Sequence, residues 1–240
     1  MRRRGPLALL PAVLAALLAA APPAHAQYVE PWEESFPDVL YPGIGAGFCD
    51  FAPLSSNPTP PGEAIAYTIV MPVVGFTTSA VEIIFGYGRF STPAGSRETI
   101  LLSTTIAYDF RLAGGGRTRL VLPVQLVGDF TKAESPVKSA SNFNIASTGL
   151  GTGLAFRSRS ENLEIAVRAT QSIQYSSEGF SANNGVAYLT QAEARLIVAG
   201  FLSLPGAVFG YRLRYQVWDL KDDRFDARSL MHGPFIGIIL

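Results

Sequence analysis

The sequence is poor in the residues on which disulfides, metal sites and nucleic-acid interfaces depend. It has one cysteine, Cys49, and two histidines, so an internal disulfide is excluded and Cys49 is expected to act as a small apolar filler. Lysine occurs only at positions 132, 138 and 221. No run of like charge is long enough to predict binding to nucleic acid.

Charged residues and helical periodicity are also scarce. Only 16% of the chain is charged, whereas 48% is hydrophobic, which is an unusual balance for a soluble secreted protein. After residue 26 no apolar run approaches the roughly 18 residues of a membrane helix, and apolar positions rarely follow helical spacing. A helical membrane protein is therefore not expected.

The first 26 residues carry an export pattern. Arg2, Arg3 and Arg4 precede the apolar run "PLALLPAVLAALLAAA", and "PPAHA" places small residues before Gln27. This order predicts a signal peptide over residues 1–26 that is removed on export. An amino-terminal membrane anchor is the alternative, but no second stop signal follows. Residues 27–40 are acidic and interrupted by proline, which predicts a flexible tail.

Apolar and polar residues alternate along most of the remaining chain. In residues 98–112 one face holds Ile100, Leu102, Ile106, Tyr108 and Phe110, and the other holds Ser103, Thr105, Asp109 and Arg111. The pattern recurs in residues 117–130, 161–175 and 210–220, and further strands are expected at 77–90, 144–157, 188–203 and 231–240. A period of two predicts strands with two different faces.

The connections between these eight strands differ in length. Short ones such as "AGGG", "SRS" and "LPG" alternate with long ones such as "TKAESPVKSASNF" and "KDDRFDARSL". Tight turns on one side and longer loops on the other are typical of a barrel that crosses a membrane.

Two further segments decide the strand number. "YPGIGAGFCDF" and "EAIAYTIVM" also alternate, and a proline-rich stretch joins them. As a hairpin they give ten strands, which is the prediction adopted here. As a cap or plug they would leave eight.

Alternation alone fits a soluble barrel with an apolar interior equally well, but the aromatic residues favour an apolar face turned to lipid. If the strands run alternately up and down, two aromatic girdles flank an aliphatic band, as lipid interfaces favour. One girdle contains Tyr87, Phe130, Tyr175 and Tyr215, and the other contains Tyr108, Phe110, Phe156, Phe209 and Tyr211.

The polar face would then line the lumen. A small barrel has room inside for side chains and little more, so charges there must pair with one another. The predicted lumen network consists of Glu82, Arg117, Arg119, Glu164, Arg168, Glu193, Arg195, Arg212 and Arg214. The barrel must also close, because hydrocarbon offers no hydrogen-bond partner to an open strand edge.

The exported amino terminus, the alternation over residues 77–240 and the final strand "GPFIGIIL" resemble those of Gram-negative outer-membrane β-barrel proteins. The resemblance implies an all-β fold, a closed antiparallel up-and-down transmembrane β-barrel over residues 41–240, in the outer membrane. It also implies contact with outer-membrane lipid and with the barrel-assembly machinery. The usual terminal aromatic residue of the family is replaced by Leu240, although Phe235 lies in the same strand.

No catalytic, cofactor or metal site is predicted. Ser229 and His232 are close in sequence but match no known catalytic arrangement, the aspartates of residues 222–226 lack ligand spacing for calcium, and "GLGTG" falls within a strand. The expected role is structural, surface-interacting or that of a narrow passive pore. The alternatives are an outer-membrane hydrolase using Ser229, His232 and the loop aspartates, and a soluble periplasmic carrier of an apolar ligand.

Overall fold

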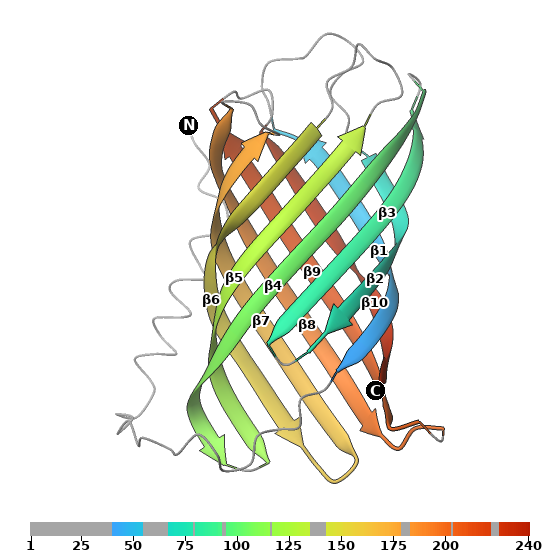
Figure 1. The fold of residues 1–240 in the computed structure, drawn as a ribbon, viewed down its shortest axis with the longest axis vertical. Helices are drawn as coiled ribbons and strands as arrows, with labels where there is room; N and C mark the ends of the chain where they lie inside the picture. The colour runs from blue at the N-terminus through green and yellow to red at the C-terminus, as the bar shows by residue number, and fades with distance from the viewer. Residues whose placement is uncertain are drawn as a thin grey trace. The chain divides into compact units, whose positions relative to one another are not determined.

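The computed structural model describes residues 40–54, 67–78, 80–92, 95–115, 117–134, 143–178, 183–202, 204–221 and 226–240. The predicted signal peptide, and all of the predicted tail except Leu40, lie outside these residues and remain predictions. None of the described residues belongs to a helix long and apolar enough to cross a membrane. The ten strands (Figure 1) are β1 Tyr41–Pro53, β2 Tyr67–Thr77, β3 Val81–Thr92, β4 Gly95–Gly115, β5 Thr118–Glu134, β6 Phe143–Arg159, β7 Leu163–Glu178, β8 Asn184–Ala199, β9 Gly206–Leu220 and β10 Ala227–Ile239.

These strands form one closed antiparallel barrel. Each strand pairs with the strands before and after it in the sequence, and β1 pairs with β10 to close the ring. The predicted ten-stranded up-and-down barrel is therefore confirmed. The alternative of eight strands with a cap is wrong, because β1 and β2 are wall strands that pair with each other from Tyr41↔Thr77 to Phe51↔Tyr67.

The two ends of the barrel differ. At one, here called the short-turn end, β2–β3, β4–β5, β6–β7 and β8–β9 are joined by tight turns, and Leu240 N donates to Leu40 O at 3.1 Å. The other is the long-loop end.

Two predicted strand limits differ from the structure. A strand was predicted to begin at residue 77, but Thr78 Oγ1 accepts from the Val81 amide at 2.8 Å and forms the β2–β3 turn there. The strand predicted to reach residue 203 ends at Ala199 because Gly200, with φ of 66°, turns the chain.

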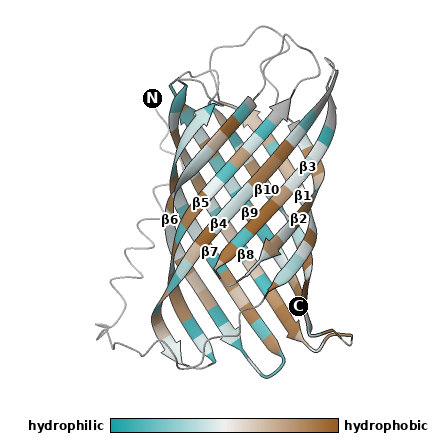
Figure 2. Ribbon diagram, viewed as in Figure 1, coloured by the Kyte–Doolittle hydropathy of each residue, from teal (hydrophilic) through white to brown (hydrophobic). Residues whose placement is uncertain are grey.

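Side chains alternate between lumen and outer surface as the sequence predicted, and Figure 2 shows hydrophobic and hydrophilic residues alternating along the strands. On β7, Ser172, Gln174 and Ser176 are buried, whereas Ile173 and Tyr175 are 62% and 57% exposed. The polar side chains point inward and the apolar side chains point outward, which is the reverse of a soluble barrel.

The interior has two differently composed halves. The long-loop half holds what is here called the apolar cluster: Cys49, Phe51, Ile69, Met71, Leu101, Ile145, Ala187, Trp218, Leu220, Ala227 and Met231. The short-turn half holds charged side chains, with a smaller apolar group of Tyr41, Ile197 and Val208. The two halves meet without a sharp boundary, since Trp218 Nε1 donates to Ser147 at 3.2 Å and Met231 stands opposite Arg214 in the β9–β10 register.

Two lumen aromatics lie against glycines of the neighbouring strand. A Cβ added at Gly210 would collide with the ring of Phe235, and one added at Gly237 would collide with the ring of Tyr41. In a barrel this narrow a ring can lie flat on the wall only where the adjacent residue has no side chain. The glycines of β9 and β10 therefore make room for interior rings.

We predict that Gly210→Ala destabilises the barrel by about 1–3 kcal/mol, because the added methyl group forces the Phe235 ring away from β9. Urea unfolding of the detergent-solubilised protein measures this. The matched control is Gly128→Ala, whose added Cβ meets no atom within 4 Å. Equal unfolding midpoints for the two variants would contradict the close approach of Phe235.

Candidate functional site

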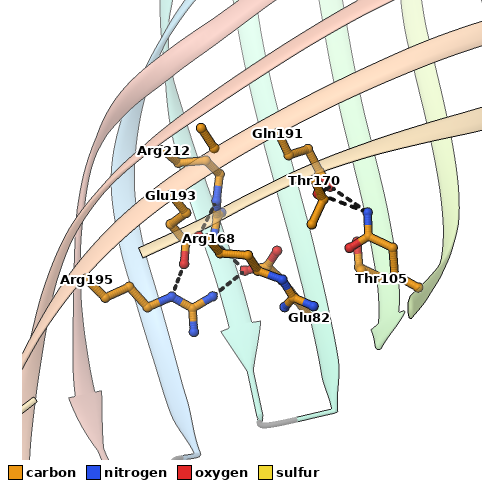
Figure 3. Close-up of a pocket in the computed structure, with 10 residues that line it drawn as sticks. Glu82, Thr105, Arg168, Thr170, Gln191, Glu193, Arg195 and Arg212 are labelled. Atoms are coloured by element: carbon orange, nitrogen blue, oxygen red, sulfur yellow. Dashed lines mark hydrogen bonds and ion pairs between the residues drawn. The ribbon is translucent and has the colours of Figure 1, made fainter. Parts of the chain in front are cut away.

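The densest group of interior charges lies in the short-turn half, on β3, β8 and β9 (Figure 3). Arg212 Nη2 lies 2.5 Å from both Glu82 Oε1 and Glu193 Oε2. Arg195 pairs with Glu193, and its Nη2 lies 3.6 Å from Glu82 Oε1. The four side chains are between 9% and 17% exposed, so each carboxylate is shared by two guanidinium groups in a nearly closed space.

A second group extends this cluster. Asp109 on β4 accepts from Arg168 at 3.4 Å and from Arg157 at 3.5 Å. Arg168 also lines a cavity of about 30 Å³ together with Glu82 and Glu193. The two groups therefore form one set of neighbouring charges.

Arginines outnumber carboxylates in this set, and aromatic rings face two of them. Arg195 lies over the ring of Tyr41, with 5.6 Å from Cζ to the ring centroid, and Arg212 lies over Phe235 at 5.0 Å. The face of an aromatic ring carries partial negative charge and attracts a guanidinium, more strongly when water is excluded. These rings, held against Gly237 and Gly210, offset part of the positive excess.

Arg214 makes a separate, more deeply buried set of bonds at mid-barrel. Its Nη2 lies 2.7 Å from Asp129 Oδ1, and its Nη1 donates to Ser103 Oγ at 2.9 Å. Asp129 also accepts from Ser103 at 2.6 Å and from Gln174 at 2.5 Å. The Arg214 and Asp129 side chains are 3% and 1% exposed, so this ion pair depends wholly on protein groups for its solvation.

Two of these contacts cross the full width of the lumen. In the ring of ten strands, β9 lies opposite β4 and β8 lies opposite β3. The bonds Arg214–Ser103 and Arg195–Glu82 join these opposite walls. The lumen is therefore spanned by side chains at two levels.

Amides and hydroxyls fill the space around these bridges. Gln125 Nε2 donates to Thr170 at 3.1 Å and to Ser172 at 3.0 Å, and Gln216 donates to Gln174 at 2.8 Å. Cavities of about 30 and 20 Å³ lie within the network. Each has room for one or two water molecules and not for a larger solute.

The structure brings together most, but not all, of the predicted lumen residues. Glu82, Arg168, Glu193, Arg195 and Arg212 form the cluster, and Arg214 belongs to the mid-barrel set. Placing Arg117 in the lumen was wrong: it is exposed in the β4–β5 turn, because the strand begins one residue later.

The two remaining predicted residues lie nearer the short-turn end. Arg119 is half-buried and stands opposite Arg157 in the β5–β6 register. Glu164 is 7% exposed and stands opposite Arg159. Glu164, Arg159 and Leu240 line a cavity of about 250 Å³ at the barrel mouth.

Sequence reasoning missed three members of the network. Asp109, Arg157 and Asp129 all form interior ion pairs, although the alternation had already placed Asp109 on the polar face. The predicted network held three glutamates and six arginines. That imbalance was the available signal, because buried arginines require further acids.

All nine predicted girdle residues project from the outward face. Tyr87, Tyr108, Phe110, Phe156, Tyr175 and Tyr211 are exposed, and Phe130, Phe209 and Tyr215 are half-buried. Tyr211 lies farther from the rim than expected, since its hydroxyl is 2.6 Å from Nδ1 of His232. His232 was expected at a strand start, but β10 already begins at Ala227.

The candidate serine–histidine pair does not form. Ser229 faces the lumen, where its Oγ lies 3.8 Å from the Cys49 sulfur. His232 lies on the outward face and stacks on Phe48 at 5.5 Å. The barrel wall separates the two side chains, because positions three apart in a strand point to opposite faces.

The loop aspartates add no site within the part of the chain that the structure describes. Asp226 accepts from the Leu220 amide at 2.8 Å and so helps close the β9–β10 connection. Asp222 and Asp223 lie outside the described residues. Among the described residues no three of histidine, cysteine, aspartate and glutamate are grouped to hold a metal ion.

Comparison with known proteins gives weak matches. No protein-family model matches the chain, and no curated protein matches it. Solved structures with a similar architecture include the outer membrane protease OmpT from Escherichia coli, with a TM-score of 0.37 and 8% identity over 85% of this chain and 98% of that one. Neisserial surface protein A has a TM-score of 0.32 and 12% identity over 84% and 97%. At these values the matches carry no information on activity.

We predict that Arg214→Leu destabilises the barrel by about 3–5 kcal/mol, because it leaves the Asp129 carboxylate buried without its cation. The control is Arg89→Leu, which removes an exposed pair with Glu98 on the outer surface and should leave the unfolding midpoint almost unchanged, because water screens such a pair. Unfolding in urea, followed by gel mobility with and without heating, measures both. A small loss for Arg214→Leu would argue that the mid-barrel ion pair is solvated.

Proposed function

We propose that the protein is an outer-membrane β-barrel with a sealed lumen, serving a structural or surface-interaction role and not that of an open pore. The observation that supports this most directly is the pair of bridges across the lumen, Arg195–Glu82 and Arg214–Ser103. A solute moving along the axis would have to break buried ion pairs and would then meet the apolar cluster. Both obstacles oppose the passage of ions and polar solutes.

The distribution of groups on the outer surface supports a position in a membrane. Large apolar side chains are exposed all around the barrel, among them Ile44, Leu126, Leu150 and Ile173. Charged residues on this face gather toward the long-loop ends of the strands: Asp50, Arg89, Glu98, Asp219 and Arg228. An apolar band below a charged rim is the surface that a bilayer requires.

The same distribution opposes the soluble carrier. A soluble barrel would bury its apolar face and present the arginines and glutamines to water. Here Gln125, Gln174 and Gln216 are at most 2% exposed.

We predict that the protein fractionates with the outer membrane and runs at different apparent sizes on gels with and without heating, because a closed barrel resists detergent unfolding. Its short-turn end should face the periplasm, as in bacterial barrels. Recovery in the soluble periplasm without a mobility shift would overturn the membrane assignment and favour the carrier.

We predict that the wild-type protein shows no steady conductance in planar bilayers, because side chains span the lumen at two levels. Replacing the arginine of each bridge, Arg195→Ser with Arg214→Ser, removes the side chains that span the lumen at both levels and should raise the conductance, whereas Arg89→Ser on the outer surface should not. The heat-dependent gel shift checks that each variant is folded. Steady conductance of the wild type would instead establish the narrow pore.

A further inference from the structure

The wall of the barrel is incompletely hydrogen-bonded between β2 and β3. These strands pair over only five positions, from Val73↔Gly86 to Thr77↔Glu82. Beyond them, β2 continues to Tyr67 paired only with β1, and β3 continues to Thr92 paired only with β4. Among the described residues the seam is thus closed by a backbone ladder in its short-turn half alone.

The sequence explains where the ladder stops. Pro72, the residue next to the last paired position of β2, has no amide hydrogen to donate, and proline in sheets is confined to edges and irregularities. Opposite it, β3 carries Gly86 and Gly88. In its long-loop half, here called the upper seam, two strand edges therefore face each other without backbone pairing. This is unusual for a wall that faces hydrocarbon.

Side-chain packing closes the upper seam. A Cβ on Gly88 would lie 2.5 Å from Ile69 Cδ1 and 3.1 Å from Met71 Cβ, and one on Gly86 would lie 3.1 Å from Met71 Cε. The inward side chains of β2 thus reach beneath the glycines of β3. This contact is apolar and non-directional, so it can separate without breaking hydrogen bonds.

The seam lies between two apolar regions. On the inner side, Ile69 and Met71 belong to the apolar cluster, which contains no charged residue. On the outer side, Val70, Phe85 and Tyr87 are 61%, 41% and 36% exposed.

Polar groups mark the upper limit of this outer apolar surface. Arg89 pairs with Glu98, and Thr68 donates to Asp50 at 3.2 Å. The seam therefore opens, just below the charged rim, toward the hydrocarbon of the adjacent leaflet.

We propose that the long-loop half of the β2–β3 seam is a lateral gate through which the alkyl chain of a membrane amphiphile enters the apolar cluster. The Ile69 and Met71 side chains are the latch, and β2 moves because β3 does not hold its upper half. Met71 and Met231 are flexible side chains that can rearrange around a guest. The ion-pair network closes the barrel along its axis, so the guest enters and leaves from the side.

An alkyl guest fits the seam better than a strand of a second copy. Both the latch and the side chains behind it are apolar, and alkyl chains surround the outer surface in the proposed membrane setting. A second copy would instead pair with the two free edges and leave the latch and cluster unused.

Trp218 provides the readout. It is 1% exposed and belongs to the apolar cluster. The chain has two tryptophans, so Trp32→Phe leaves Trp218 as the only tryptophan, which can be excited selectively. Stearate dibrominated in mid-chain quenches a tryptophan that it touches, and unbrominated stearate is the control for binding without quenching.

A reversible lock tests the route. Met71→Cys with Gly88→Cys places two sulfurs across the seam, where the Cβ positions are 3.1 Å apart, close to the roughly 3.5–4.5 Å of a disulfide. Cys49→Ser removes the competing thiol. The same protein is then measured oxidised and reduced, and the heat-dependent gel shift shows that both forms are folded.

We expect dibrominated stearate to quench Trp218 several-fold more in the reduced protein than in the oxidised protein, with quenching restored by reductant. Equal quenching in the two forms, or none in either, would overturn the lateral gate. A dimer that is abolished by the disulfide would also overturn it and would assign the two edges to pairing between copies. Steady conductance of the wild type would contradict only the sealed lumen, and equal or absent quenching would contradict only the lateral gate. The two experiments therefore test the two proposals separately.

Discussion

The structure depends on one electrostatic constraint: in a ten-stranded barrel every charge that points inward must be neutralised by another side chain. Arg214 shows the constraint most clearly. Its guanidinium is almost fully buried and is satisfied by Ser103 on the opposite strand β4, by Asp129 on β5 and by Gln216 of its own strand. Such bonds hold distant strands at fixed separations. They also occupy the axis, so the interactions that stabilise the fold are the same ones that close the lumen.

The constraint divides the interior. Charged groups gather in the short-turn half, where Tyr41 and Phe235 offset the excess of arginine. The long-loop half holds the apolar cluster, together with uncharged polar groups such as Ser147, which bonds Ser176 and Trp218. Among the described residues the longest unpaired stretch of the wall lies in that half, between β2 and β3, whereas the gaps in β1–β10 and β5–β6 span two positions each. A wall backed by paired charges cannot part without exposing them, whereas a wall backed by apolar groups can.

Much of this arrangement follows from a period of two in the sequence. Alternation assigned the inward arginines other than Arg117 and the outward aromatics to the faces on which they lie, and it identified β1 and β2 as strands despite their glycines. It could not determine how far along the barrel axis each residue lies, or which residues of neighbouring strands pair. Sliding a strand by two residues along its neighbour leaves the same residues on each face. For that reason Arg117 was placed in the lumen, His232 was placed at a strand start, and the partners Asp109 and Asp129 were not recognised. The gap beside Pro72 depends on which residues face each other across neighbouring strands, which no single-strand pattern contains.

Cys49 shows what closure does for a lone thiol. Its sulfur is buried at the junction of the first and last strands and lies 3.8 Å from the Ser229 hydroxyl of β10. Until β10 has joined β1, nothing on that side shields it. The thiol is therefore exposed in any chain whose first and last strands have not yet joined, and it becomes buried only when the last strand is in place. An incompletely assembled chain has an accessible thiol at Cys49, whereas a closed barrel does not. Alkylation of Cys49 would therefore distinguish assembled from unassembled protein.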